Sequence, residues 1–189
     1  DATWPELPFA CCRIDAGEIA KAIRTGLPHE RIFETVGIYE QALRKHLLEG
    51  DASPRVWFAV VPEDVYKYGR PQSVVPRSER IASPLGIKKA AAIRLIKEPS
   101  MFDEVNEDAK PFEFEANFHN QLKARLLDTG QVIQVVRETT LETARDPQAR
   151  RRSLQDPASV AWNLGSTSFY KSGGTPWRLA DVREGVCYV

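Results

Sequence analysis

Residues 30–48 carry apolar side chains at the spacing of an α-helix. Charged residues occupy the intervening positions, a pattern typical of an amphipathic helix packed on a core. We expect this long helix to end near Gly50, and a shorter helix over residues 18–23 to precede it. The apolar stripe consists of Ile32, Val36, Tyr39, Leu43 and Leu47.

Short runs of β-branched and aromatic residues predict strands at three places. The run VWFAVVP at residues 56–62 is continuously apolar and bounded by proline, as expected of a strand buried on both faces of a parallel sheet. QVIQVV at residues 131–136 is a second such run, and GVCYV at residues 185–189 begins a third. Because the chain stops within this third run, we expect it to be a piece of a larger protein.

Two further helices are predicted in the second half of the chain. The segment FEFEANFHNQLKARLLDTG has apolar residues at successive i+4 positions from Phe114 to Leu126 and stops at Gly130. Farther on, Asp156 is placed as an N-cap and Pro157 as the first residue of a helix. Two adjacent glycines, Gly173 and Gly174, are expected to end that helix.

The segment from residue 70 to residue 115 is the least regular. Its proline, serine and charge predict loops, including a solvated acidic loop over residues 101–110. AAAIRLI at residues 90–96 fits either a helix or a strand, and EDVYKYG at residues 63–69 predicts a short helix. Helices that alternate with short buried strands predict an α/β fold, a Rossmann-like, open and mostly parallel sheet flanked by helices.

Charge is balanced overall but not along the chain. Lysine plus arginine and aspartate plus glutamate each number 26 in 189 residues, which excludes a uniformly basic surface. Residues 1–118 carry 16 basic and 19 acidic groups (−3), whereas residues 119–189 carry 10 and 7 (+3). The second part includes the arginines 145 and 150–152, which we interpret as a solvated stretch, with contact to phosphates or to a partner subunit as the alternative.

Three cysteines form neither a disulfide framework nor a metal-ligand spacing. We expect the adjacent pair, Cys11 and Cys12, to be small buried apolar residues. The sequence has no secretory signal and no apolar run long enough to cross a membrane. These features predict a cytoplasmic protein that does not act at a membrane.

Enzyme motifs are missing from the sequence, which has no glycine-rich nucleotide fingerprint, phosphate loop, HExxH or nucleophile elbow. Of the three histidines, His29 and His46 lie in charged helical sequence and are expected to be solvated. His119 differs, because Lys123 follows it by four residues and shares its face of the predicted helix. Taken alone, this pair is most simply two polar residues at a helix edge.

Gln134 and Lys171 add polar groups at two further positions. Gln134 lies inside an apolar strand, where a buried amide must find hydrogen-bond partners, unless it sits at an exposed strand end. Lys171 ends the last predicted helix, where a cation interacts favourably with the helix dipole. Together with His119 and Lys123, these groups would suit a terminal phosphate, which carries nearly two negative charges and several acceptor oxygens.

Four segments, taken together, resemble one protein family. FHNQLKARLL, IQVVRETTL, VAWNLGSTSFYKSGGTPWRL and GVCYV resemble the MID domain of Argonaute proteins and its junction with the PIWI domain, most closely the short prokaryotic Argonautes. RVWFAVVPEDVYKYGRPQSVV is similar to the upstream strand of the same group. The resemblance implies a connecting segment over residues 1–16, a MID domain over 17–183, and the truncated start of a PIWI domain at 184–189.

The resemblance also implies a binding site. In this family a pocket holds the 5′ phosphate of a guide strand, and the positions that match it are His119, Lys123, Gln134 and Lys171. Asn163 matches a residue near the first guide nucleotide. The implied function is binding without catalysis, since the slicing carboxylates of active relatives lie in PIWI strands that follow this segment. No cofactor is required, although a magnesium ion at the guide 5′ end is compatible with the resemblance.

The partners implied by the resemblance are a guide RNA, with a guide DNA as the alternative, and a target DNA in the full-length protein. A further implied partner is an effector subunit with an APAZ region fused to a TIR or sirtuin-type domain, in a complex that silences or senses invading nucleic acid. Two other interpretations stay open. One is a Rossmann-like enzyme or binding domain for a small phosphorylated metabolite, and the other is a structural fragment whose polar positions only pack.

Overall fold

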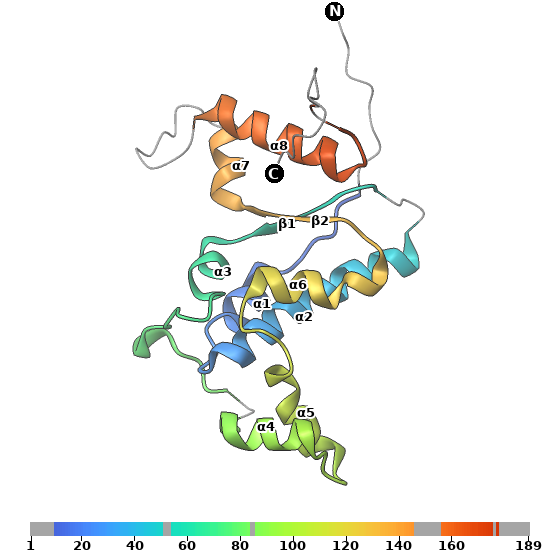
Figure 1. Ribbon diagram of the computed structural model, residues 1–189. Helices are drawn as coiled ribbons and strands as arrows, with labels where there is room; N and C mark the ends of the chain where they lie inside the picture. Colours follow the sequence, from blue (N-terminus) through green and yellow to red (C-terminus); the bar gives the residue numbers. More distant parts are fainter. Residues whose placement is uncertain (1–9, 51–53, 84–85, 146–155, 176, 178–189) are drawn as a thin grey trace, which may run out of the picture. The chain divides into compact units, whose positions relative to one another are not determined.

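Two short parallel strands lie among helices (Figure 1). The computed structural model describes residues 10–50, 54–83, 86–145, 156–175 and 177. The chain divides into two compact units between Thr139 and Thr140. Both strands belong to the first unit.

Helices α1 (Ala16–Ala22) and α2 (Pro28–Glu49) confirm the two helices expected near the start. Asp15 caps α1, because its side chain accepts a hydrogen bond of 2.8 Å from the backbone N–H of Glu18. α2 begins with proline, which suits the first helical position, and its C-cap is Gly50. Most of the predicted stripe is buried and its last member is partly buried against the same core: Ile32, Val36, Tyr39, Leu43 and Leu47.

Strands β1 (Trp57–Val61) and β2 (Ile133–Arg137) form a parallel sheet. The register pairs Trp57 with Ile133 at one end and Val61 with Arg137 at the other. The chain is therefore a mixed α/β protein, mostly helical, with a small open parallel sheet of two strands in its described part. The third predicted strand, residues 185–189, lies outside the described residues.

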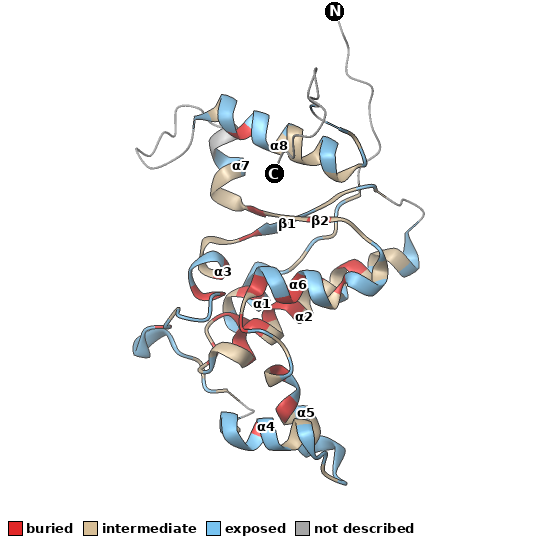
Figure 2. Ribbon diagram, viewed as in Figure 1, coloured by how far each residue is buried: buried red, intermediate tan, exposed pale blue. Residues whose placement is uncertain are grey.

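Successive side chains of β1 point to opposite faces of the sheet. Trp57 and, on β2, Val135 pack against a buried core to which α1, α2 and α6 (Phe118–Arg125) contribute, coloured red in Figure 2. Phe58 and Val60, on the other face of β1, are 45% and 41% exposed. The prediction of a strand buried on both faces is therefore wrong, because the helical core of this unit packs on one face.

Helix α6 is shorter than the helix predicted to start at Phe114. Asn117 caps it by accepting a hydrogen bond of 3.1 Å from the backbone N–H of Asn120, so the helix begins one turn later than expected. A 3-10 turn, η3 (Leu127–Thr129), follows and leads to Gly130 at φ +65°. Glycine adopts this left-handed conformation without strain, so the predicted glycine stop is confirmed.

Two of the predictions for the middle of the chain concern short helices. α3 (Glu63–Tyr68) confirms the helix expected directly after the first strand, and the 3-10 turn η1 (Arg77–Glu79) follows it. α4 (Lys89–Lys97) shows that the ambiguous AAAIRLI segment is helical. Alanine, leucine, lysine and arginine are strong helix formers, and they make up most of this segment.

Helix α5 (Asp103–Ala109) and the 3-10 turn η2 (Lys110–Phe112) stand where a solvated loop was expected, so that prediction is wrong. Asn106 supplies the physical reason. Its side chain accepts a 2.8 Å hydrogen bond from the backbone N–H of Ser100 and donates a 2.9 Å hydrogen bond to the Ser100 carbonyl. These two bonds tie the chain before the helix to its first turns.

Arg31 holds the irregular chain after α3 against α2. Its side chain is among the most buried in the protein, and Nε donates a 3.0 Å hydrogen bond to the carbonyl of Tyr68. A second guanidinium nitrogen donates to the carbonyl of Ser73. Burying a charge is costly unless hydrogen bonds compensate, so these carbonyls account for an arginine at this position.

The second unit contains α8 (Pro157–Lys171), while α7 (Glu138–Arg145) spans the division between the units. The start of α8 is as predicted, since the side chain of Asp156 accepts a 3.2 Å hydrogen bond from the backbone N–H of Ser159. The chain after it turns through Gly173 at φ +91°. The arginines at 150–152 lie outside the described residues.

A partly buried ion pair joins α2 to α6. Arg125 on α6 contacts Glu40 on α2, and each side chain is 15% exposed. The same guanidinium donates a 3.0 Å hydrogen bond to the carbonyl of Phe33, and its carbon lies 4.5 Å from the centre of the Phe33 ring and 5.7 Å from that of Phe114. Ion pairing, hydrogen bonding and cation–π contact therefore all act on one side chain.

Replacing Arg125 with methionine is expected to lower the free energy of unfolding by about 3 kcal/mol, because it leaves the Glu40 carboxylate in a partly buried site without its closest partner. Chemical denaturation measures the loss. The matched control is Arg44→Met, since Arg44 also pairs with Glu40 but is 38% exposed, and it should cost at most about 1 kcal/mol. Equal losses in the two variants would contradict this account.

Candidate functional site

Helix α6 presents a polar surface formed by His119 and Lys123. Both side chains are exposed, whereas Phe118 and Leu122, one position before each, are buried in the core. His119 makes one hydrogen-bonding contact, of 3.3 Å, between its Nδ1 and the side-chain oxygen of Asn120. Within the described residues no acidic group lies within ion-pair distance of the Lys123 ammonium, so its charge faces solvent.

Gln134 lies in the middle of β2 and is half-buried. Its side-chain nitrogen donates a 3.0 Å hydrogen bond to the carbonyl of Val135, which satisfies part of the amide. Alternation along the strand places Gln134 on the face opposite to Ile133 and Val135, which belong to or pack on the helical core. No hydrogen bond joins it to His119 or Lys123 in the described part of the chain.

Lys171 and Asn163 belong to the second unit, where both lie on α8. Lys171 is the last residue of the helix and is half-buried, and Asn163 is exposed two turns earlier. The carbonyl of Asn163 accepts a 3.3 Å hydrogen bond from the Ser166 hydroxyl. The two lysines proposed for one phosphate therefore come from different units of the chain.

Three residues that were not among the predicted ones gather at the carboxyl ends of the two strands. Two guanidinium groups make cation–π contacts with the Tyr66 ring on α3. The guanidinium carbon of Arg70 lies 4.0 Å from the ring centre and that of Arg137 lies 3.9 Å from it. Arg137 also binds Glu63 through bonds of 2.6 and 2.9 Å. Ligands of open α/β sheets commonly bind at this edge. Tyr66 and Arg70 are four residues apart, a spacing visible in the sequence, whereas Arg137 is about 70 residues away and has no local pattern that links it to them.

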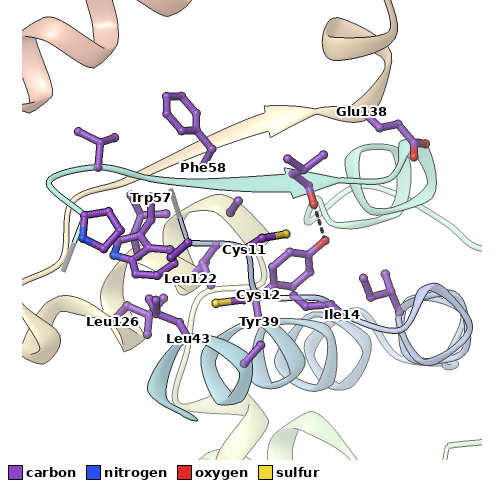
Figure 3. A pocket seen from close by; sticks show the side chains of 18 of the residues that line it. Cys11, Cys12, Ile14, Tyr39, Leu43, Trp57, Phe58, Leu122, Leu126 and Glu138 are labelled. Carbon is purple, nitrogen blue, oxygen red and sulfur yellow. Dashed lines mark hydrogen bonds between the residues drawn. The ribbon is translucent and has the colours of Figure 1, made fainter. Parts of the chain in front are cut away.

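A largely apolar cavity of about 700 Å³ lies in the first unit, between the segment before α1, helices α2 and α6, and the sheet (Figure 3). Its polar groups are largely engaged within the protein. The Tyr39 hydroxyl donates a 2.9 Å hydrogen bond to the carbonyl of Val60, and Nε1 of Trp57 donates one of 2.9 Å to the side chain of Gln131. Residues that line it include Cys11, Cys12, Tyr39, Leu43, Trp57, Leu122, Leu126 and Glu138.

The composition of this cavity makes it unsuitable for a phosphate. Among the described residues that line it there is no lysine, arginine or histidine, and the charged one is the acidic Glu138. A phosphate would have to leave water without gaining a cation, which is strongly unfavourable. A phosphate site on the first unit therefore has to lie on a cationic surface, such as that of α6, and not in this cavity.

The cysteines and two of the histidines differ from their predictions. Cys11 is exposed and not buried as expected, while Cys12 is half-buried, and burial, with a smaller effect of Cys11, raises the pKa of the Cys12 thiol. A raised pKa lowers the thiolate fraction at neutral pH, which disfavours a nucleophilic role.

The rings of His29 and Phe112 stack with their centres 4.8 Å apart, and those of His46 and Trp57 lie 5.2 Å apart, so neither histidine is the solvated residue that was expected.

The described surfaces offer no cluster of the usual metal ligands. No group of three or more histidine, cysteine, aspartate or glutamate side chains converges within the described residues. His119 and Lys123 offer nitrogen groups, whereas magnesium prefers oxygen ligands, so these residues do not fit a magnesium ion.

None of the helices in the described ranges is both long and apolar enough to cross a bilayer.

A scan against protein-family models and a search among curated proteins both found no match.

Filling the apolar cavity should stabilise the first unit. Ala42 on α2 lines the cavity, and we expect Ala42→Leu to raise the free energy of unfolding by about 1 kcal/mol because the added carbons replace void or solvent. Thermal and chemical denaturation measure the gain. Ala124→Leu on the exposed side of α6 is the control and should change stability by less than about 0.5 kcal/mol. A loss of stability in Ala42→Leu alone would mean that the cavity is already filled.

Proposed function

We propose that this chain binds the 5′-phosphorylated end of a guide oligonucleotide, as a Rossmann-like MID domain of a short prokaryotic Argonaute. The observation that carries the proposal is the pair His119 and Lys123, exposed one turn apart on α6, with no acidic partner for Lys123 in the described residues. Two hydrogen-bonding groups, one of them an ammonium, thus share one helix face.

The chemistry of a terminal phosphate suits this pair. A phosphate monoester carries close to two negative charges at neutral pH, and charge-assisted hydrogen bonds from an ammonium group are about twice as strong as neutral ones. Lys123 supplies such a group on a rigid helix, and His119 adds a directed hydrogen bond. The resemblance adds Gln134 and Lys171 to the proposed phosphate site and Asn163 to the first nucleotide. Because Gln134 lies on the sheet face away from the core and Lys171 belongs to the second unit, the pair on α6 alone carries the proposal.

The proposed role is binding and not catalysis. Phosphate contacts position a strand without reading its bases, so the site would fix the guide in register for pairing with a target. The partners proposed with it are a guide RNA, with guide DNA as the alternative, a target DNA in the full-length protein, and an APAZ-containing effector subunit with a TIR or sirtuin-type domain. The proposed location is the cytoplasm, and residues 184–189 would begin the PIWI domain.

Binding should depend on the 5′ phosphate. We expect a 5′-phosphorylated RNA of 20 nucleotides to bind about tenfold more tightly than the same RNA with a 5′ hydroxyl, the ratio that corresponds to one charge-assisted interaction. Lys123→Ala and Lys171→Ala should each reduce this ratio toward one. Fluorescence anisotropy with a dye on the 3′ end measures both affinities.

The control for the lysine variants is Lys97→Ala, which removes one exposed positive charge from α4. It should leave the ratio between the two RNA ends unchanged. Equal affinity of the wild-type protein for the two ends, or an unchanged ratio in both lysine variants, would refute the proposed phosphate site. A 5′ nucleoside monophosphate that competes as strongly as the oligonucleotide would favour the small phosphorylated metabolite instead.

A further inference from the structure

The start of α6 lies directly against the end of α3. The backbone N–H of Phe118 donates a 2.9 Å hydrogen bond to the carbonyl of Gly69. A Cβ atom on Gly69 would lie 3.0 Å from Cβ of Phe118 and 2.5 Å from the carbonyl oxygen of Val65, so this close approach requires glycine. Arg70 follows Gly69 on one side of this contact, and His119 follows Phe118 on the other. Arg70 therefore leaves the backbone beside the first turn of the helix that carries His119 and Lys123.

Arg70 is held by an aromatic ring and not by an acidic group. Its guanidinium carbon lies 4.0 Å from the centre of the Tyr66 ring. In the part of the chain that the structure describes, no carboxylate comes within 4 Å of it. Both the arginine and the tyrosine are exposed, the latter by 39%. A cation–π contact of this kind uses none of the guanidinium N–H groups in a hydrogen bond to the ring edge, so an exposed arginine in this position can still donate to an oxyanion.

The acidic residues around Tyr66 are already paired with other cations. Glu63 binds Arg137, which also stacks on the Tyr66 ring at 3.9 Å. Asp64 binds Arg24 at 2.8 Å. Arg70 is therefore a positive charge beside Tyr66 that neither of these carboxylates pairs with, as is Lys67, whose ammonium lies over the Tyr68 ring.

We infer that Arg70, oriented by Tyr66, is a further phosphate-binding residue, which contacts a phosphodiester of the strand whose 5′ phosphate binds at α6. The inference rests on the proposed function for the identity of the strand. The Tyr66 ring acts as a support for Arg70, because its centre lies within 4.0 Å of the guanidinium carbons of both Arg70 and Arg137. The ligand class is thus the sugar–phosphate backbone, recognised by charge and hydrogen bonding and not by sequence.

The salt dependence of binding tests this inference. Each phosphate contact made by a cation on a single strand adds about 0.7 to the slope of log affinity against log salt concentration, so Arg70→Gln should reduce that slope by about 0.7 for the 5′-phosphorylated RNA. Because the contact is to a phosphodiester, the affinity of the 5′-hydroxyl RNA should fall by the same factor, about fivefold or more at low salt. The affinity of a 5′ nucleoside monophosphate, which has no phosphodiester, should not change.

Variants of Tyr66 test the support. Tyr66→Phe keeps the ring and should bind as the wild type does, whereas Tyr66→Leu should reproduce the loss seen in Arg70→Gln. Arg94→Gln, at an exposed position on α4, removes the same charge elsewhere and should leave the slope unchanged. An unchanged slope and affinity in Arg70→Gln would overturn the inference, as would equal losses in Arg94→Gln.

The outcomes separate this inference from the proposed function. If Lys123→Ala abolishes the preference for a 5′ phosphate while Arg70→Gln has no effect, the end-binding site stands and the second contact fails. If the wild-type protein shows no preference for a 5′ phosphate but Arg70→Gln still lowers the salt slope, Arg70 contacts a backbone without the proposed end-binding site, and the link drawn here between the two contacts is wrong.

Discussion

The contact of Arg125 with α2 determines which face of α6 is turned to solvent. Phe118, Leu122 and Arg125 follow one another at spacings of four and three residues, so they lie on one side of the helix. The first two are buried in the core, and the guanidinium of the third is held by the Glu40 carboxylate and the Phe33 carbonyl. With that side fixed inward, His119 and Lys123 are displaced by about 100° and reach solvent.

The sheet edge and the helix surface are connected through short backbone contacts. The close approach of Gly69 to Phe118 brings the end of α3 to the start of α6, and Arg31 holds the chain beyond α3 against α2. The carboxyl ends of β1 and β2 lead into α3 and α7 at the same edge of the parallel sheet. Arg70 and the α6 pair, His119 and Lys123, are therefore attached to elements that hydrogen bonds hold together, whereas the cavity between the sheet and the helices is apolar.

Much of this architecture follows from the sequence because its signals are local. The stripe from Ile32 to Leu47 and the cap at Asp156 each lie within a single element, and both predictions hold. The loop expected at residues 101–110 is helical instead, since its start is stabilised by a side-chain bridge between Ser100 and Asn106 that composition does not reveal. Exposure of Phe58 also differs from expectation, because the apolar run does not tell how many layers cover the strand.

The candidate site is predictable only in part, for a related reason. The spacing of His119 and Lys123 is a property of one helix, and Tyr66 and Arg70 are likewise four residues apart, whereas the contact of Arg137 with Tyr66 joins segments about 70 residues apart and has no local signature. Gln134 could not be placed from the sequence either. The continuous apolar pattern of its strand does not show which face of the sheet the side chain lies on or which residues surround it.

The central claim is that the ammonium group of Lys123 meets a 5′ phosphate. Nuclear magnetic resonance of the lysine side-chain ammonium groups, assigned by comparison with Lys123→Arg, tests it most directly. The account predicts that the Lys123 resonance shifts on addition of a 5′-phosphorylated RNA and moves much less with the same RNA bearing a 5′ hydroxyl. A Lys123 resonance that moves equally with both RNAs, or with neither, would contradict it.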